Sequence, residues 1–261
     1  MPRFAANLGY LFTDRPLIER IDAAARCGFK AIELQFPYDV PPLDVKRAIE
    51  RNSLTILGIN TPTGERPGEF GLAAVPGREK DFETLFLRAL DYISAIDGTA
   101  VHCLAGHVPP DQRPAAERVF LSNLARAADR AADKSIGLLI EPVNARDRPN
   151  YFLNHVEHAA DIIAKLALPN VRMQFDFYHA QIVGGDLITR FEKNLPVIGH
   201  LQCAGVPVRC EPDAGEVSYP AVFDAVDRLG WTGWIGAEYR PRGRTEAGLG
   251  WGAKYGLIAQ A

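Results

Sequence analysis

Oxygen-bearing side chains stand at the ends of four successive apolar runs in the second half of the chain. They are Glu141 in LLIEPVN, Asp176 in RMQFDFYH, Gln202 in GHLQC and Glu238 in WIGAEYRP. If these runs are parallel strands of one barrel, their carboxyl ends converge on one pocket. Three carboxylates in one pocket repel each other unless a proton or a cation is present.

The four side chains match the ligand preferences of a hard cation, because Mg²⁺ and Mn²⁺ favour carboxylate and carbonyl oxygens. For any one residue, a solvated carboxylate at a strand end is the more common arrangement. Four such residues at matching positions favour a shared site instead. We therefore predict a site for one divalent metal ion, Mg²⁺ or Mn²⁺, and the predicted ligands are Glu141, Asp176, Gln202 and Glu238.

Two further polar residues follow the predicted strands. His179 comes three residues after Asp176, where it either donates to a substrate oxygen or caps the local backbone. Arg209 lies in the segment that follows GHLQC, where a guanidinium suits a substrate carboxylate. The alternative for Arg209 is a surface ion pair with Glu211 or Glu216.

The run IGHLQC places His200 and Gln202 on one face and Leu201 and Cys203 on the other, because strand side chains alternate. Considered alone, the two polar residues are expected to hydrogen-bond within the protein. With three carboxylates at neighbouring strand ends, Gln202 becomes a predicted ligand. His200 is then expected one strand repeat deeper, ~6–7 Å below it, outside the ligand set.

The other histidines are weaker candidates for metal or substrate binding. His155 and His158 share a predicted helix face that is more simply explained as solvated than as a metal pair. His102 and His107 lie at and just after another apolar run. Glu33 is expected to face the interior, with no role assigned.

Eight apolar runs alternate with amphipathic helical stretches, which predicts a parallel α/β sheet. Eight strands close a (β/α)₈ TIM barrel, and we predict one such domain over residues 1–261. An open doubly wound sheet is the alternative, weakened because no GxGxxG follows the first run. Two long segments, 60–79 and 204–220, are expected to be binding loops.

Composition and charge limit the classes of binding partner that the chain is expected to have. The net charge of −3 gives no reason to expect nucleic-acid binding, and no apolar run is long enough for a membrane span. The amino-terminal residues show no secretory apolar core. Four scattered cysteines without CxxC predict free thiols and a cytoplasmic location. No GxSxG, P-loop or HExxH is present. The oligomeric state stays open, with a homo-oligomer among the alternatives.

Several motifs resemble a known family along nearly the whole chain: RFAANL, CGFKAIELQFPYD, IEPVN, DFYHAQ and EYRP, in this order. They are similar to hydroxypyruvate isomerases and 2-oxo-tetronate isomerases of the xylose isomerase-like TIM-barrel superfamily. The resemblance implies metal binding by Glu141, Asp176, Gln202 and Glu238, with the two glutamates as proton carriers. Similarity to ketose 3-epimerases implies that His179 and Arg209 hold substrate oxygens.

The implied reaction interconverts hydroxypyruvate and tartronate semialdehyde, or a 2-oxo-tetronate and its isomer, through an enediolate. The implied substrate is thus a small hydroxy-keto acid. A ketose 3-epimerase or another sugar or inosose isomerase is the alternative, although those epimerases carry a histidine where this chain has Gln202. A metal-dependent endonuclease of the same barrel is disfavoured, because such enzymes need many histidines and a basic surface, whereas this chain has only six histidines and a net charge of −3. A barrel that binds an acid without catalysis is a third class of function. Gly205 and His102 depart from the family pattern near the substrate end of the pocket.

Overall fold

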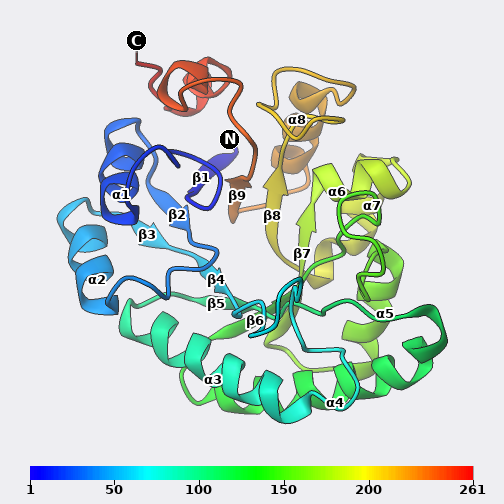
Figure 1. The fold of residues 1–261 in the computed structure, drawn as a ribbon. Coiled ribbons are helices and arrows are strands. Elements are labelled where there is room, and N and C mark those ends of the chain that lie inside the picture. The colour runs from blue at the N-terminus through cyan, green and yellow to red at the C-terminus, as the bar shows by residue number, and fades with distance from the viewer. Residues whose placement is uncertain (261) are drawn as a thin grey trace.

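A computed structural model describes residues 1–260, and its strands form one sheet in which every pairing is parallel (Figure 1). The hydrogen-bonded order is β3-β2-β1-β9-β8-β7-β6-β5-β4. The strands are β1 (Arg3–Asn7), β2 (Ala31–Glu33), β3 (Thr55–Ile56), β4 (Gly58–Asn60), β5 (Ala100–His102), β6 (Gly137–Ile140), β7 (Val171–Asp176), β8 (Ile198–Cys203) and β9 (Trp234–Ala237).

The sheet curves into a nearly closed barrel, and the break in its hydrogen-bonded order lies between β3 and β4. These two strands stand at opposite ends of the hydrogen-bonded order, yet Leu57 alone separates them in the chain. Leu57 donates its N–H to Ile32 and accepts from Thr99, so the third predicted run joins both sides. The other seven runs each contain one strand. The predicted (β/α)₈ TIM barrel is therefore confirmed, with its third strand in two pieces.

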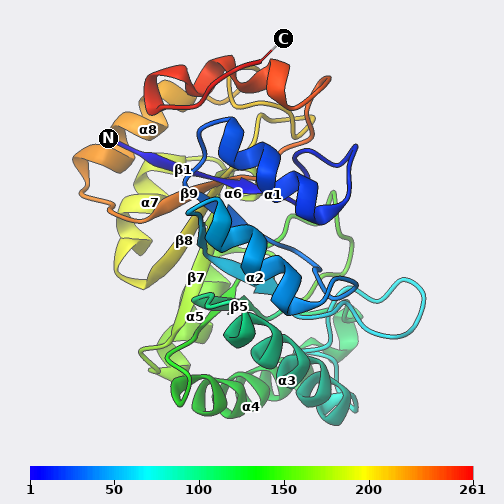
Figure 2. The ribbon, with the colours of Figure 1, turned by 90° about the vertical axis from the view of Figure 1, so that its left-hand side faces the viewer.

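Helices cover the outside of the barrel, as Figure 2 shows for α1, α2 and α3. Each is amphipathic, and the apolar stripe packs on the strands. Helix α1 stops before Gly28, whose φ of 90° is the left-handed conformation that glycine adopts without strain. The helices are α1 (Leu17–Arg26), α2 (Pro42–Arg51), α3 (Glu79–Ala95), α4 (Arg113–Ala132), α5 (Val156–Leu166), α6 (Phe177–Val183), α7 (Leu187–Asn194) and α8 (Tyr219–Arg228), with 3₁₀ helices η1 (Pro110–Gln112), η2 (Leu195–Val197) and η3 (Glu246–Tyr255).

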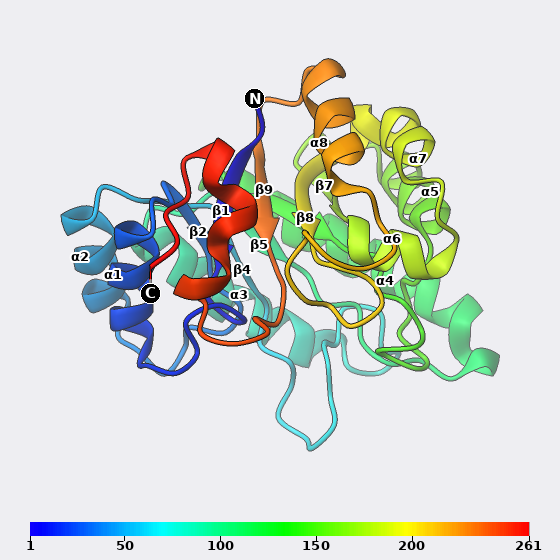
Figure 3. The same cartoon turned by 90° about the horizontal axis from the view of Figure 1, so that it is seen from above.

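The two long segments that the sequence marks as loops lack helix and strand over most of their length. Residues 61–78 follow β4, and the cyan tip of this loop extends away from the barrel in Figure 3. Residues 204–218 follow β8 and connect it to α8. Both loops therefore leave the carboxyl ends of strands, where ligands of this fold bind.

The side chains of β8 alternate as predicted. Leu201 and Cys203 are fully buried among the apolar residues of the core, whereas His200 and Gln202 line a cavity inside the barrel. Glu33 of β2 reaches the same place: its carboxylate lies 2.6 Å from Gln202 Nε2 and 3.0 Å from His200 Nε2. To get there it passes over β9 at Gly236, where a Cβ would lie 1.6 Å from Glu33 Oε1.

The β1–α1 loop is tied to the last part of the chain. Phe12 donates its N–H to Thr245 Oγ1 at 2.8 Å, and Arg15 pairs with Glu246 at 2.7 Å. Figures 1 and 2 show η3, in red, lying next to the blue amino-terminal elements. These contacts hold the loop that carries Tyr10, which lines the cavity.

Among the described residues, no helix has both the length and the apolar character that crossing a membrane requires.

We predict that Gly236→Ala destabilises the protein by about 1–3 kcal/mol, because the added methyl group overpacks against Glu33. Urea unfolding measures the change. Gly243→Ala is the matched control, because nothing lies within 4 Å of a Cβ there. In a Glu33→Ala background the same change at Gly236 costs less, since the clashing carboxylate is gone. Equal stability of Gly236→Ala and the control variant would contradict this assignment.

Candidate active site and metal centre

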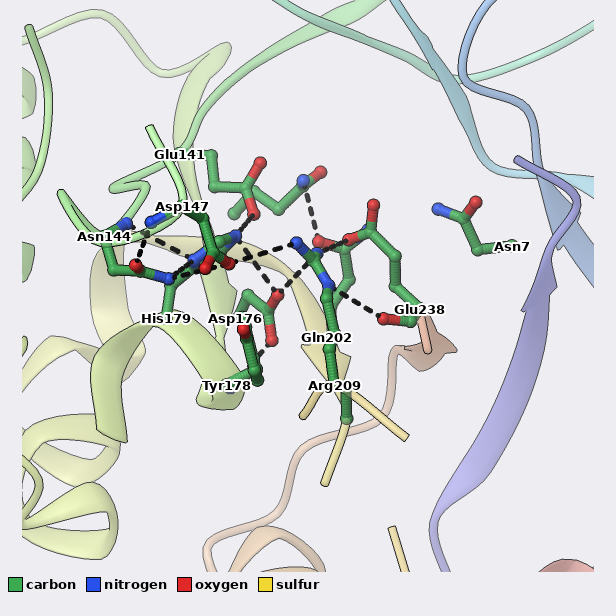
Figure 4. Close-up of polar contacts among 12 residues, drawn as sticks. Asn7, Glu141, Asn144, Asp147, Asp176, Tyr178, His179, Gln202, Arg209 and Glu238 are labelled. Atoms are coloured by element: carbon green, nitrogen blue, oxygen red, sulfur yellow. Dashed lines mark hydrogen bonds and ion pairs between the residues drawn. The ribbon is translucent and has the colours of Figure 1, made fainter. Parts of the chain in front are cut away.

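A cavity of about 500 Å³ opens inside the barrel and contains most of the predicted site residues. Figure 4 shows their side chains pointing toward one another from strands β7 and β8, from helix α6 and from the segments that follow β6, β8 and β9. The cavity lining includes Glu141, His179, Gln202, Arg209 and Glu238, and Asp176 contacts two of these residues. The structure thus brings together all six residues to which the sequence assigns a metal or substrate contact.

The three carboxylates are buried, with exposed fractions of 6% for Glu141, 2% for Asp176 and 5% for Glu238. Burial raises the pKa of Glu238 to about 8, and the charge of Asp176 adds to the rise while Arg209 opposes it. Burial likewise raises the pKa of Asp176 to about 6 against the effect of Arg209. The pKa of Glu141 is raised well above its usual value by burial and by the charges of Glu238 and Asp176.

Two carboxylate oxygens of the site, Glu141 Oε1 and Glu238 Oε2, are buried without a hydrogen-bond partner within residues 1–260. Glu238 Oε2 lies 3.2 Å from Arg209 Nη2, but the geometry is that of an ion pair alone. Buried polar atoms are normally satisfied, so unpaired ones need an explanation. Hard oxygen atoms with raised pKa values fit a divalent cation, which would supply the missing partner.

Asp176 is placed by the direct junction of β7 and α6. Its Oδ1 caps α6 by accepting the Tyr178 N–H at 2.8 Å, which leaves Oδ2 facing the cavity residues. Oδ2 lies 3.4 Å from Arg209 Nη2 and 3.7 Å from His179 Nε2. The motif DFYH therefore puts a carboxylate and an imidazole side by side because no loop separates the strand from the helix.

The amide of Gln202 has a fixed orientation. Its Nε2 donates to Glu33 Oε2 at 2.6 Å, and its Oε1 accepts from Gln174 Nε2 at 2.9 Å. Because a carboxylate oxygen accepts, Nε2 must face Glu33 and the oxygen is turned the other way. An amide oxygen has two lone pairs, so one remains for a further partner.

The imidazole of His179 has a defined tautomer. The backbone N–H of Asn144 donates to its Nδ1 at 3.3 Å, and Asn144 Nδ2 lies 2.7 Å from the same atom. Nδ1 is therefore an acceptor, and the hydrogen of the neutral ring sits on Nε2. Burial and the charge of Arg209 hold the pKa of His179 well below its usual value.

Nε2 of His179 lies 3.8 Å from Glu141 Oε1, so its N–H points at the carboxylates. Ligand atoms of Glu141, Asp176 and His179 all lie within 4.8 Å of one another. Since a metal ligand needs a nitrogen without a hydrogen, the tautomer of His179 favours a donor to a substrate oxygen over a metal ligand.

Arg209 is buried, and its guanidinium lies between the rings of Tyr10 and Tyr178, 4.8 Å from each centroid. This sandwich fixes a cation against Asp176 and Glu238, and cation–π contacts are strong when desolvated. The surface alternative for Arg209 is wrong.

The two acids of that alternative have other partners. Glu211 pairs with Arg242 at 2.9 Å, and Glu216 accepts from Gln181 at 3.3 Å.

The remaining five histidines lie in three places. His200 and His102 are buried and line the cavity, with His102 Nδ1 at 3.5 Å from Glu141 Oε2. His155 is exposed at the start of α5, and His158 packs on Phe152 and faces Glu117. His107 stacks on Phe70 beside the cavity.

Several residues of the site are absent from the sequence predictions. Gln174 shares a strand face with Asp176, so the alternation of β7 is a signal for it. Asn144 lies inside the motif IEPVN. Gln35 and Tyr178 likewise lie inside the motifs CGFKAIELQFPYD and DFYHAQ. Their partners come from distant segments, as in the contact of Gln35 Nε2 with Glu238 Oε1 at 2.6 Å. Tyr10 has no such signal.

The chain is similar to proteins of known family along nearly its whole length. The family model described as xylose isomerase-like TIM barrel matches residues 21–255. The chain is 45% identical over 253 residues to the 2-oxo-tetronate isomerase of Cupriavidus necator, covering 96% of this chain and 97% of the relative. It is 36% identical over 253 residues to the hydroxypyruvate isomerase of Escherichia coli, covering 96% and 98%.

Among solved structures, the fold is similar to a crystal structure described as an AP endonuclease, family 2, from Brucella melitensis. The TM-score is 0.95 at 42% identity, and the match covers 98% of this chain and 99% of the other. The match extends over the barrel and the loops that carry the site residues.

We predict that the metal-free protein loses stability as the pH rises from about 7 to about 8. Folded Glu238 keeps its proton to about pH 8, whereas the unfolded side chain loses it near 4.5. The folded state then binds more protons than the unfolded state, so stability falls with rising pH. The buried histidines His102 and His179 act oppositely, but only below their unfolded value of 6.5.

Thermal unfolding of chelator-treated protein across this range measures the slope. Glu238→Gln is expected to reduce it, because the titrating group is removed. A melting temperature that stays constant or rises from pH 7 to pH 8 would show that Glu238 is ionised throughout.

Proposed function

This chain belongs to the xylose isomerase-like TIM barrel family, and we propose that it is a divalent-metal-dependent isomerase of small hydroxy-keto acids. The proposed reaction interconverts hydroxypyruvate and tartronate semialdehyde, or a 2-oxo-tetronate and its isomer. Relatives named as isomerases of both substrates support it. The observation that carries the proposal is a pair of buried oxygens, one on Glu141 and one on Glu238, that have no hydrogen-bond partner in the described part of the chain. Both residues line the cavity beside the guanidinium of Arg209.

The reaction moves a proton between neighbouring carbons and shifts the carbonyl group. One glutamate takes the proton from the carbon that bears the hydroxyl, and an enediolate is formed. The same proton, or one from the other glutamate, is then delivered to the adjacent carbon. The hydroxyl proton leaves its oxygen, which becomes the new carbonyl oxygen, and a proton is returned to the former ketone oxygen, so no proton is gained or lost overall. Burial raises the pKa values of Glu141 and Glu238 in the metal-free protein, and a bound cation would lower them. Each glutamate would then start as a carboxylate that accepts the carbon-bound proton, as acid–base catalysis requires.

The cation is proposed to be Mg²⁺ or Mn²⁺, and its ligands would be Glu141, Asp176, Gln202 and Glu238. Their hard oxygen atoms and the fixed amide of Gln202 support this ligand set. When bound, the metal supplies positive charge where the negative charge of the enediolate develops.

His179 and Arg209 are proposed to orient the substrate. The Nε2–H of His179 is a donor beside the carboxylates, suited to a ketone or hydroxyl oxygen. The guanidinium of Arg209 is held by Tyr10 and Tyr178, so it can bind a substrate oxygen without reorganising.

A ketose 3-epimerase or another sugar isomerase is the alternative within the fold, and an assay panel of hydroxy-keto acids and ketoses separates the two. The Brucella melitensis description raises DNA cleavage as another class. The net charge of −3 argues against a phosphodiester substrate, which proteins bind with positive surfaces.

We predict that Glu141→Gln and Glu238→Gln each lower kcat by about 10²–10⁴-fold or more, because each removes a proton carrier. Steady-state assays on hydroxypyruvate and 2-oxo-tetronates measure the loss, and circular dichroism verifies folding. Glu157→Gln on the exposed face of α5 is the control and keeps full activity. Near-normal rates in both site variants would rule out the assignment.

We further predict that a chelator abolishes turnover and that Mg²⁺ or Mn²⁺ restores it. In D₂O the product is expected to carry solvent deuterium at the carbon that accepts the proton, as an enediolate path requires. Mass spectrometry of the product measures the label. Activity that survives complete metal removal, or a product without label, would point to a different mechanism.

A further inference from the structure

The cavity that holds the site extends along the barrel axis to the opposite end. At the carboxyl ends of the strands it is lined by residues such as Glu141 and Glu238. It is also lined by residues at the amino ends of four strands: Gly58 of β4, Thr99 and Ala100 at β5, Gly199 of β8, and Gly233 and Trp234 at β9. Thr99 to His102 spans roughly 10 Å at the rise of a strand, so one cavity crosses the barrel.

Small side chains keep the lower barrel open. The interior of a TIM barrel is normally filled by bulky branched residues. Here Gly58 and Ala100 are register partners, and an ideal Cβ on Gly58 would lie 3.7 Å from the Ala100 Cβ, so both positions face the same side. Gly199 on β8 also has no side chain, and Leu139 packs beside it, since a Cβ there would lie 3.1 Å from Leu139 Cδ2. Leu57 and Leu139 line the cavity as well, so the opening lies on the side of Gly58 and Ala100. Thr99 and Gly199 are exposed and Ala100 is partly exposed, so solvent reaches this end.

The middle of the cavity is polar. Glu33, His102, Gln174, His200 and Gln202 line it between the two ends. Both ring nitrogens of His102 are buried without a hydrogen-bond partner among residues 1–260. A buried polar group of this kind is normally paired with ordered water, and water needs two to four polar partners in a cavity of sufficient size. Both conditions are met beneath the carboxylates.

We propose that the barrel axis holds a continuous file of water molecules, from His102 and His200 beneath the active site to solvent beside Ala100. We infer that the reacting proton exchanges with solvent through this file while substrate fills the upper mouth. In that exchange a proton passes from a protonated glutamate to water, and a solvent proton replaces it, so nothing else is consumed. This second part rests on the proposed isomerase function, whereas the water file does not.

A high-resolution crystal structure of the protein, which needs neither metal nor activity, tests the file itself. Ordered waters are expected between His200 and Ala100, and Ala100→Leu is expected to remove them while the upper site stays unchanged. A lower barrel that is dry, or filled by rearranged side chains, would overturn the proposal whether or not the protein is an isomerase.

Isotope partition tests the exchange. A substrate deuterated at the carbon that loses its proton is converted in H₂O, and the label kept in the product is measured early in the reaction. Wild type is expected to lose most of the label, and Ala100→Leu to retain a several-fold larger share with an unchanged KM. Ala132→Leu, at the exposed end of α4, is the matched control and should behave as wild type.

The isotope experiment and the crystal structure give different outcomes for the two parts of the proposal. If folded Ala100→Leu retains no more label than wild type, exchange uses the upper mouth and the second part of the proposal is wrong. Ala100→Val, a smaller block, serves if the leucine variant does not fold. A wild type without isomerase activity refutes the proposed function, and the crystal structure still decides whether the file exists.

Discussion

Like charges buried around one point are the constraint on which the site depends. Glu141, Asp176 and Glu238 lose most of their hydration at the barrel mouth, and burial is the largest cause of each raised pKa. One guanidinium, that of Arg209, opposes this effect at all three carboxylates. Such a cluster is relieved by protons or by a cation, so binding of a metal and release of protons become one linked equilibrium.

The residues around the site hold its ligand and substrate-binding side chains in fixed orientations. Glu33 fixes the amide of Gln202 from across the barrel, and the missing side chain of Gly236 gives it the space to do so. Tyr10 and Tyr178 fix Arg209 from two other segments, while Asn144 sets the tautomer of His179. Outer partners of this kind orient ligands and tune their basicity.

Local patterns in the sequence predict much of this arrangement. Strand alternation separates His200 and Gln202 from the apolar side of β8, and convergence of parallel strand ends predicts that Glu141, Asp176 and Glu238 meet. The division of the third strand at Leu57 follows from closure of the ring, which no local pattern encodes. Metal binding and the roles of the individual residues stay predictions, because the arrangement is compatible with them without testing them.

The contacts that escape prediction join segments far apart in the chain. Glu33 with Gln202, and Tyr10 with Arg209, depend on how the barrel closes and on which loops fold over its mouth. Residue types alone do not specify such pairs, because the chain has many other glutamates and tyrosines that could make the same kind of contact. Only the tertiary fold selects them.

The tie between the first loop and the last segment also bears on how the protein is made. A ribosome releases the amino-terminal strands first, and domains tend to fold as they emerge. The partners of Phe12 and Arg15, which are Thr245 and Glu246, are synthesised 233 and 231 residues later. The loop that carries Tyr10 therefore lacks these anchors in any chain that ends before Thr245. A fragment that ends between Arg209 and Thr245 would hold Arg209 incompletely, so the arginine sandwich reaches its final form only after Glu246 has been synthesised.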